Sequence, residues 1–287
     1  MDLLITHANA ETKLSQLGIY NITIDDSSPS IEVDRRTVKG RSGYIHDGIT
    51  LRQKLIKVTG RLAVASLSAF MEKQDELVGW LYGDEPYFVT KMHPTQDDLY
   101  EFELPGAKNG DLNLLDIPHT AWKYRYKVHI NNEIEYSFIG KSQAGLKYDV
   151  SFELATAELP FGETKPTDIT LSGGTIPYNG TAALNQLETP YTVELVSSAI
   201  QNSFFLEIDG RRWSYVHTET AIQAGQKLLL SGVESTLYKG VATSDLNINN
   251  RTNYEYFVIR PNPQKQVRYS TNFRGTIRIL GFKELYK

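Results

Sequence analysis

The sequence predicts a mainly β protein built from two domains. Apolar and polar residues alternate with a period of two, most clearly between Trp122 and Leu154. Only residues 66–82 carry helical spacing of their apolar side chains. A stretch at 155–182 that is rich in Pro, Gly and Thr separates two sets of short strands. We therefore expect domains at 1–158 and 159–287.

Composition narrows the functional classes. The chain has 287 residues, of which 40% are hydrophobic, so it can build a sizeable core. Its net charge of -4 gives no general attraction to nucleic acid or to an anionic membrane. It has no cysteine, which excludes disulfides, thiolate nucleophiles and cysteine-held zinc or iron–sulfur sites. No signal-peptide pattern and no run of 18 apolar residues occurs, so we expect a soluble protein that is not exported by a signal peptide.

The first half combines strands with a single helix. Residues 55–62, 87–92 and 99–104 have strand patterns. Between the first two lies the segment with helical spacing, in which Ser66 is the expected N-cap and Gly83 the stop. Because a strand–helix alternation does not repeat along the chain, the helix is expected to cover one sheet of an otherwise β domain.

Residues 122–138 read as a hairpin. A three-residue loop, Ile130 to Asn132, would oppose residues 128 and 134, 126 and 136, and 124 and 138, which keeps the apolar side chains on one face. A third alternating run follows from Leu146 to Leu154.

The second half reads as a β-sandwich of short strands separated by turns. One turn is specific: Asp209-Gly210 favours a two-residue type I′ turn that opposes Leu206 with Trp213 and Phe204 with Tyr215. The expected strands are 191–196, 204–208, 212–217, 227–230, 254–260 and 276–280.

The sequence contains no pattern that indicates catalysis. It lacks HExxH, GxSxG, P-loop and GxGxxG motifs, and its six histidines are scattered. The acidic residues at 25–26, 97–98, 101 and 103 are typical of loops and strand faces. A calcium-loop-like start at Asp245 fails at its sixth and twelfth positions. We therefore expect no enzyme, no metal and no cofactor.

Two groups of residues are candidates for binding. Arg35, Arg36, Lys39 and Arg41, closed by Tyr44, form the only dense basic cluster. This cluster is either a solvated hairpin tip or an inter-subunit contact, for which arginine is favoured. Trp213 and Tyr215 are either part of a packed sheet or rings that stack on a glycan or a partner.

The order of these segments resembles the distal tail proteins of siphophages of Gram-positive bacteria. The resemblance covers nearly the whole chain, and no single motif in it is diagnostic. In the first half it is carried by Ile31–Asp34, Arg41–Gly43, the strand 55–62, the helix 66–82, Asp149–Glu153 and Leu159–Phe161; in the second half by Thr189–Leu195, Lys227–Gly232, Phe257–Pro261 and Thr276–Tyr286.

The resemblance implies a structural hub of the virion. In that family an N-terminal, β-sandwich-like tail-hub domain with one covering helix closes a ring, usually a hexamer, and a galectin-like β-sandwich follows it. The implied partners are further copies of the chain, the major tail tube protein, the tail-associated fibre or lysin, and receptor-binding proteins. Phage DNA would pass through the ring without sequence-specific contact. The implied location is the distal end of the tail, after synthesis in the host cytoplasm.

Two other functions stay open at this point. One is a carbohydrate-binding β-sandwich protein that contacts host cell-wall glycans through Trp213 and its neighbours. The other is a glycan hydrolase built on a β-sandwich, which needs two carboxylates across a cleft.

Overall fold

The computed structural model describes residues 1–95, 118–143, 145–217, 221–238 and 246–287. It is mainly β, as predicted, and divides into two compact units. Unit 1 comprises residues 1–162 together with Lys287, and unit 2 comprises residues 163–286. The strand expected at 99–104 lies outside the described residues. Within the described part of the chain, no helix is long and apolar enough to cross a membrane.

The main sheet of unit 1 is antiparallel. Its strand order is β2-β1-β7-β9-β11-β6-β3, with β10 added to β11 and β8 added to β7. The strands are β1 (Asp2–Thr6), β2 (Glu11–Lys13), β3 (Ile19–Asp26), β6 (Leu55–Val64), β7 (Tyr87–Pro94), β8 (His119–Ala121), β9 (Tyr126–Ile130), β10 (Glu135–Ser142) and β11 (Gly145–Thr156).

The sheet of unit 1 curls around its own core, which makes the unit sandwich-like. The two ends of the strand order are linked through Leu14, whose N–H donates to Leu3 O (3.0 Å) and whose carbonyl accepts from Ile19 N (3.2 Å). Side chains from β1, β3, β6, β7, β9 and β11 belong to one apolar cluster.

Helix α1 (Leu67–Leu81) covers this cluster, as the sequence predicts. Ser66 is its N-cap, and the hydroxyl of Ser66 accepts a hydrogen bond from Ala69 N (3.2 Å). Phe70, Leu77 and Leu81 are the buried side chains of the helix. The ring of Phe70 stacks on Tyr148, with 4.0 Å between the ring centroids.

The hairpin predicted at 122–138 is wrong. Strands β9 and β10 do not pair with each other but lie end to end along one edge of β11: β10 pairs with Gly145–Ser151 and β9 with Leu154–Thr156. The loop between them follows the same edge, since Asn131 N donates to Glu153 O (2.8 Å). The physical reason is that β9 uses its two edges for β7 and β11, which leaves none for β10.

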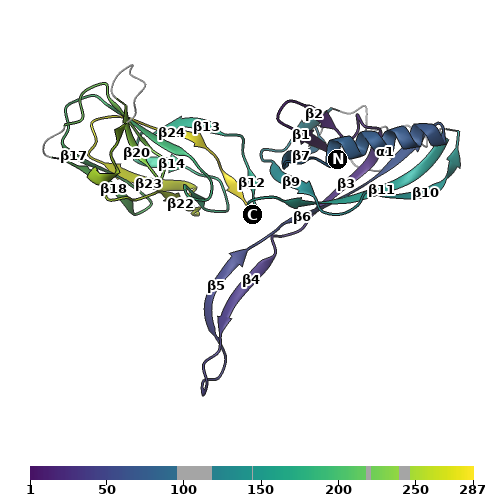
Figure 1. Cartoon of the computed structure of the whole chain (residues 1–287), viewed down its shortest axis with the longest axis horizontal. Coiled ribbons are helices and arrows are strands. Elements are labelled where there is room, and N and C mark those ends of the chain that lie inside the picture. Colours follow the sequence, from purple (N-terminus) through teal and green to yellow (C-terminus); the bar gives the residue numbers. More distant parts are fainter. Residues whose placement is uncertain (96–117, 144, 218–220, 239–245) are drawn as a thin grey trace. The chain divides into compact units, whose positions relative to one another are not determined.

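A two-stranded arm, residues 27–53, is inserted between β3 and β6. It consists of β4 (Ile31–Arg36) and β5 (Ile45–Leu51), which pair antiparallel with a bulge between Asp34 and Arg35. Backbone hydrogen bonds from Ser27 N to Leu55 O (2.9 Å) and from Ser30 N to Gln53 O (2.7 Å) continue the β3–β6 pair into the arm. Figure 1 shows the arm as two long paired strands that end in a loop.

Unit 2 is a two-sheet sandwich. One sheet has the order β13-β24-β16-β19-β20-β21 and the other β14-β23-β17-β18, and β15 pairs with β22. β12 (Gly162–Glu163) straddles the division between the units. The other elements are β13 (Thr167–Thr170), β14 (Thr175–Pro177), β15 (Leu184–Asn185), β16 (Thr192–Ser197), β17 (Ser203–Ile208), β18 (Arg211–Val216), β19 (Lys227–Leu230), β20 (Ser235–Tyr238), β21 (Leu246–Asn247), a 3-10 turn (Asn249–Arg251), β22 (Val258–Ile259), β23 (Gln266–Thr271), β24 (Gly275–Phe282) and β25 (Leu285–Tyr286).

The turn at Asp209-Gly210 is confirmed together with its register. Both residues have positive φ, 51° and 78°, as a type I′ turn requires. Leu206 opposes Trp213 and Phe204 opposes Tyr215. The strand predicted at 254–260 is wrong except for Val258–Ile259, because Tyr254 has a φ of 55° that no regular strand adopts. Strand β23 was missed.

Candidate assembly interface

The arm has no core of its own. No residue from Ser27 to Gln53 is buried. A two-stranded ribbon is marginally stable in water unless something packs on it. Its exposure in a single copy makes it a candidate interface.

One face of the arm is apolar. Ile31 opposes Leu51 and Val33 opposes Ile49, so these four aliphatic side chains share a face. Ile31 is 63% exposed and Ile49 is 59% exposed. This face was not predicted, although the alternation Ile31-x-Val33 and Ile49-x-Leu51 signals it.

The polar face of the arm carries exposed ion pairs. Arg52 pairs with Glu32, and Arg36 lies 3.5 Å from Asp47. All four side chains are more than two-fifths exposed, so each pair contributes at most about 1 kcal/mol. These ion pairs therefore add little to the stability of the arm.

The predicted basic cluster lies at the far end of the arm. The guanidinium of Arg35 stands 4.5 Å from the ring centroid of Tyr44. Arg41 N donates to Val38 O (3.1 Å), which closes the turn that also holds Lys39. The structure thus brings together the predicted residues Arg35, Arg36, Lys39, Arg41 and Tyr44, and all of them are exposed. From residue 35 to residue 46 the sequence has four cations and no carboxylate.

A buried charged cluster fixes the root of the arm. Asp26, the last residue of β3, accepts from Lys91 Nζ (2.7 Å) and lies 3.2 Å from Lys54 Nζ. Tyr126 donates its hydroxyl hydrogen to the same carboxylate (3.3 Å). Burial raises the pKa of Asp26, but the two lysines outweigh this effect and hold it below its usual value. The cluster joins β3, β7 and β9 to Lys54, the residue that precedes β6, at the point where the arm leaves the sheet.

Trp213 and Tyr215 do not form a binding face. They are 1% and 0% exposed and pack with Phe204 on the inner face of the four-stranded sheet. A ring that stacks on a glycan or a partner must be exposed, so this placement contradicts the predicted contact. The alternation with apolar neighbours is compatible with a buried and with an exposed face, and the burial of both side chains places them in the core.

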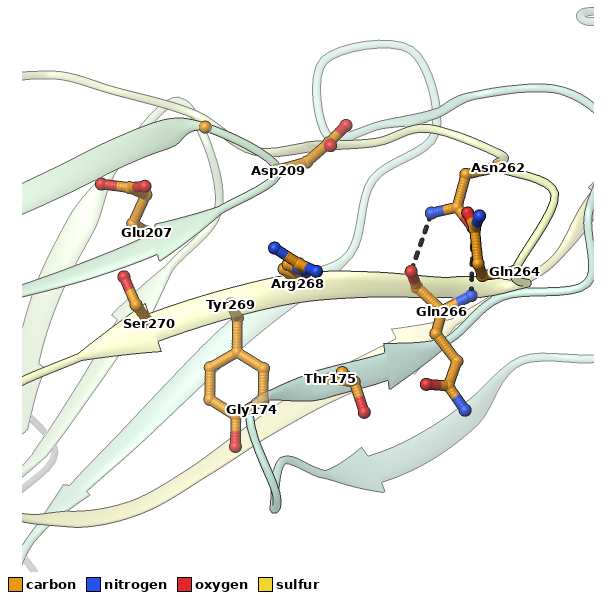
Figure 2. Close-up of a pocket in the computed structure, with 11 residues that line it drawn as sticks. Gly174, Thr175, Glu207, Asp209, Asn262, Gln264, Gln266, Arg268, Tyr269 and Ser270 are labelled. Atoms are coloured by element: carbon orange, nitrogen blue, oxygen red, sulfur yellow. Dashed lines mark hydrogen bonds between the residues drawn. The ribbon is translucent and has the colours of Figure 1, made fainter.

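The opposite, outer face of that sheet carries a polar groove of about 900 Å³. Glu207, Asp209 and Arg268 border it, as Figure 2 shows. Asp209 also pairs with Arg260 at 3.1 Å, and Asn262 Nδ2 donates to Gln266 O (2.7 Å). The other lining residues are Gly174, Thr175, Gly210, Gln264, Gln266, Tyr269 and Ser270. Such a surface offers hydrogen-bond donors and acceptors.

Metal-ligating clusters are absent from the described part of the chain: no group of three or more His, Asp or Glu residues there is placed to hold an ion. Asp245 and the acidic residues 97, 98, 101 and 103 lie outside the described residues.

Comparisons with known proteins point to a fold. No protein-family model matches the sequence, and no curated protein matches it. The crystal structure of the SPP1 Dit (gp 19.1) protein, described as a paradigm of the hub adsorption apparatus in phages that infect Gram-positive bacteria, matches with a TM-score of 0.64 and 12% identity over 99% of each chain. Two structures of the phage p2 baseplate in its activated conformation, with Sr and with Ca, match at 8% identity with TM-scores of 0.37 and 0.38, over 99% of this chain and 97% of theirs.

The likeness to SPP1 Dit spans both units and therefore concerns the whole architecture. At 12% identity it shows a shared fold. The mainly β fold with one helix that we expected from the resemblance to distal tail proteins is confirmed at this level.

Proposed function

We propose that the chain is a structural protein of the phage virion, a distal tail protein that assembles into a closed ring and acts as the hub of the tail tip. The shared fold with SPP1 Dit supports this role. The feature that supports ring formation is the arm, because its apolar face and its basic tip are exposed in a single copy.

A contact between the arm and a different surface of a second copy is heterologous. Heterologous contacts repeat from copy to copy and close into a ring when the rotation allows it. An isologous contact between two arms would instead end at a dimer. The fold likeness to a hub protein favours the ring, and the family resemblance favours six copies.

The remaining parts of the proposal follow from the same resemblance. Unit 1 closes the ring and contacts the tail tube protein, unit 2 faces receptor-binding proteins, and the fibre or lysin lies below. The protein is made in the host cytoplasm and is located at the distal end of the tail. It catalyses no reaction. Incubation with host cell-wall polysaccharide and peptidoglycan should release no more reducing ends than a heat-killed control, and release above that control would contradict this part.

The ring is tested by the mass of the full chain in solution at high micromolar concentration. We expect the wild type to sediment as a closed oligomer. The variant Arg35→Glu, Arg36→Glu, Arg41→Glu should sediment as the 32.4 kDa chain. A control that reverses three exposed lysines that are not part of the arm, Lys141→Glu, Lys165→Glu and Lys265→Glu, has the same net charge and should still assemble. A wild type that stays at 32.4 kDa would contradict the ring.

The polar groove favours a second candidate function, binding of a cell-wall glycan by unit 2. Arg268 lies exposed in the groove without an ion-pair partner among the described residues, and carboxylate and amide groups stand beside it. Planar polar groups of this kind donate to and accept from vicinal hydroxyls. We expect Arg268→Ala to abolish binding of purified cell-wall polysaccharide in titration calorimetry, and Arg274→Ala, an exposed arginine outside the groove, to leave it unchanged. An absence of heat with the wild type would exclude this function.

A further inference from the structure

The exposed apolar side chains of unit 1 gather in two places. Among the described residues, eleven large hydrophobic side chains of unit 1 are exposed, and eight of them belong to the arm or to helix α1 with its C-cap. Those of the arm are Ile31, Val38, Tyr44 and Ile49; those of the helix are Leu67, Met71, Val78 and Tyr82. The helix therefore carries a second apolar surface in addition to its buried face.

This second surface is a stripe of four side chains along the helix. Leu67, Met71, Val78 and Tyr82 are separated by four, seven and four residues, a spacing that places them in one row along the helix. They are 45–60% exposed. The buried residues Phe70, Leu77 and Leu81 form a separate row that faces the sheet. The stripe has the pattern of a helix that contacts a second surface.

The stripe is bordered by negative charge. Asp75 lies four residues after Met71 and three before Val78, and Glu72 lies one turn before Asp75; both are exposed. Glu76 pairs with Lys73 at 2.5 Å. From Leu67 to Glu85 the sequence has five carboxylates and one lysine, a net charge of -4. The tip of the arm, residues 35–46, has four cations and no carboxylate, a net charge of +4.

The two surfaces also match in length. The fifteen residues of α1 extend about 22 Å at 1.5 Å per residue. The six residues of β4 extend about 20 Å at 3.3 Å per residue, and the last two of them, Arg35 and Arg36, begin the basic tip. An apolar ribbon with a basic tip thus corresponds in length and charge to an apolar stripe with an acidic border.

We propose that the arm of one copy docks on helix α1 of the next copy, with the Ile31/Val33/Ile49/Leu51 face on the Leu67–Tyr82 stripe and the basic tip beside Glu72 and Asp75. Both surfaces are exposed within the same chain, so one copy does not cover its own helix. The inference rests on the proposed ring and specifies which surface of the neighbour receives the arm. The exposed Gly79, with no atom within 4 Å of an added Cβ, lets a strand approach the helix closely.

The absence of cysteine from the chain gives a direct test. The double variant Ile49→Cys, Met71→Cys is treated with a short bis-maleimide, and we expect a ladder of covalent oligomers. Each single variant alone should yield at most dimers. In the matched control, Ile49→Cys is combined with Ile200→Cys, an exposed apolar position of unit 2, and should yield no ladder.

A charge exchange tests the polar half of the contact. Charge reversal at the tip of the arm (Arg35→Glu, Arg36→Glu, Arg41→Glu) should weaken self-association by roughly tenfold or more, because like charges then face each other. Charge reversal on helix α1 (Glu72→Lys, Asp75→Lys) should weaken it by the same factor for the same reason. The two sets combined should restore it. Far-UV circular dichroism and the melting transition of unit 1 show whether each variant is folded.

The outcomes separate this inference from the ring. If the wild type assembles but the cysteine pair gives no ladder and the combined charges give no rescue, the docking on α1 is refuted and the ring stands. If the wild type does not assemble, the ring and the docking both fail. A ladder together with rescue supports both.

Discussion

Removing the carboxylate at the root of the arm should destabilise unit 1 far more than removing an exposed one. In the variant Asp26→Asn, the ammonium of Lys54 stays only 6% exposed and loses its counter-charge at 3.2 Å. Loss of one partner from a buried ion pair costs about 3–5 kcal/mol. We take the lower end, about 3 kcal/mol, because the side chain of Asp26 is 22% exposed.

The expected shift in melting temperature follows from the size of unit 1. A domain of 150–250 residues loses about 2–4 °C per kcal/mol, so the transition of unit 1 should fall by about 6–12 °C. The matched control is Asp149→Asn, which removes an ion pair with Arg61 at 3.2 Å whose side chains are 52% and 56% exposed. Exposed pairs contribute at most about 1 kcal/mol, so the control should shift by no more than about 4 °C.

Differential scanning calorimetry measures both variants, and its pH dependence provides a second check. The pKa of Asp26 is lowered in the folded state, so its contribution is complete above the unfolded value of about 3.9 and is lost as the pH falls through the lower folded value. The difference between wild type and Asp26→Asn should therefore shrink below about pH 4. Equal shifts for Asp26→Asn and Asp149→Asn at neutral pH would refute the role of the buried cluster.

Three further predictions concern backbone, ionisation and domain structure. Gly145→Ala should abolish the denaturant-unfolding transition of unit 1, because the residue has a φ of 106° and an added Cβ would lie 2.1 Å from Val64 O. The control Gly43→Ala also has positive φ but lies in open space, so its free energy of unfolding should fall by only about 1 kcal/mol. Burial raises the pKa of Tyr178 to about 12, so a difference titration against Tyr178→Phe should show no ionisation near pH 10, and stability should fall between about pH 10 and 12. Deletion of 160–287 should leave a folded fragment that still associates, and excised unit 2 should be a soluble monomer with its own calorimetric transition; one shared transition with insoluble fragments would contradict this.

Local signals predicted much of the fold. The hairpin 203–216 could be predicted down to its register because Asp209-Gly210 tolerates the two positive φ values of a type I′ turn. Helix α1 could be predicted because its cap and its apolar spacing agree. Both features depend on residues close together in the sequence.

The wrong predictions concern contacts between residues that are far apart in the sequence. The alternation in β9 and β10 shows which residues share a face but says nothing about which strand lies at each edge, and the edges are occupied by β7 and β11. Trp213 and Tyr215 alternate in the same way whether their face is buried or exposed, so only the second sheet, packed over them, decides. The basic tip of the arm was found as a charge cluster, but its apolar face was overlooked because four aliphatic residues far apart in sequence form it only after β4 and β5 pair.

Strand β11 determines when unit 1 can finish folding during synthesis. It is the shared neighbour of β6, β9 and β10, and its contact with β6 joins residues as far apart as Leu55 and Ala155, 100 positions along the chain. Strand pairs that are so far apart in sequence form slowly, because the intervening chain loses conformational entropy before the new contacts stabilise the fold. During synthesis, one edge of β6 therefore stays unpaired until the chain has been made up to residue 156, the end of β11. The nascent chain is exposed to misassembly over that interval, and a chaperone or a slow onset of self-association would protect it.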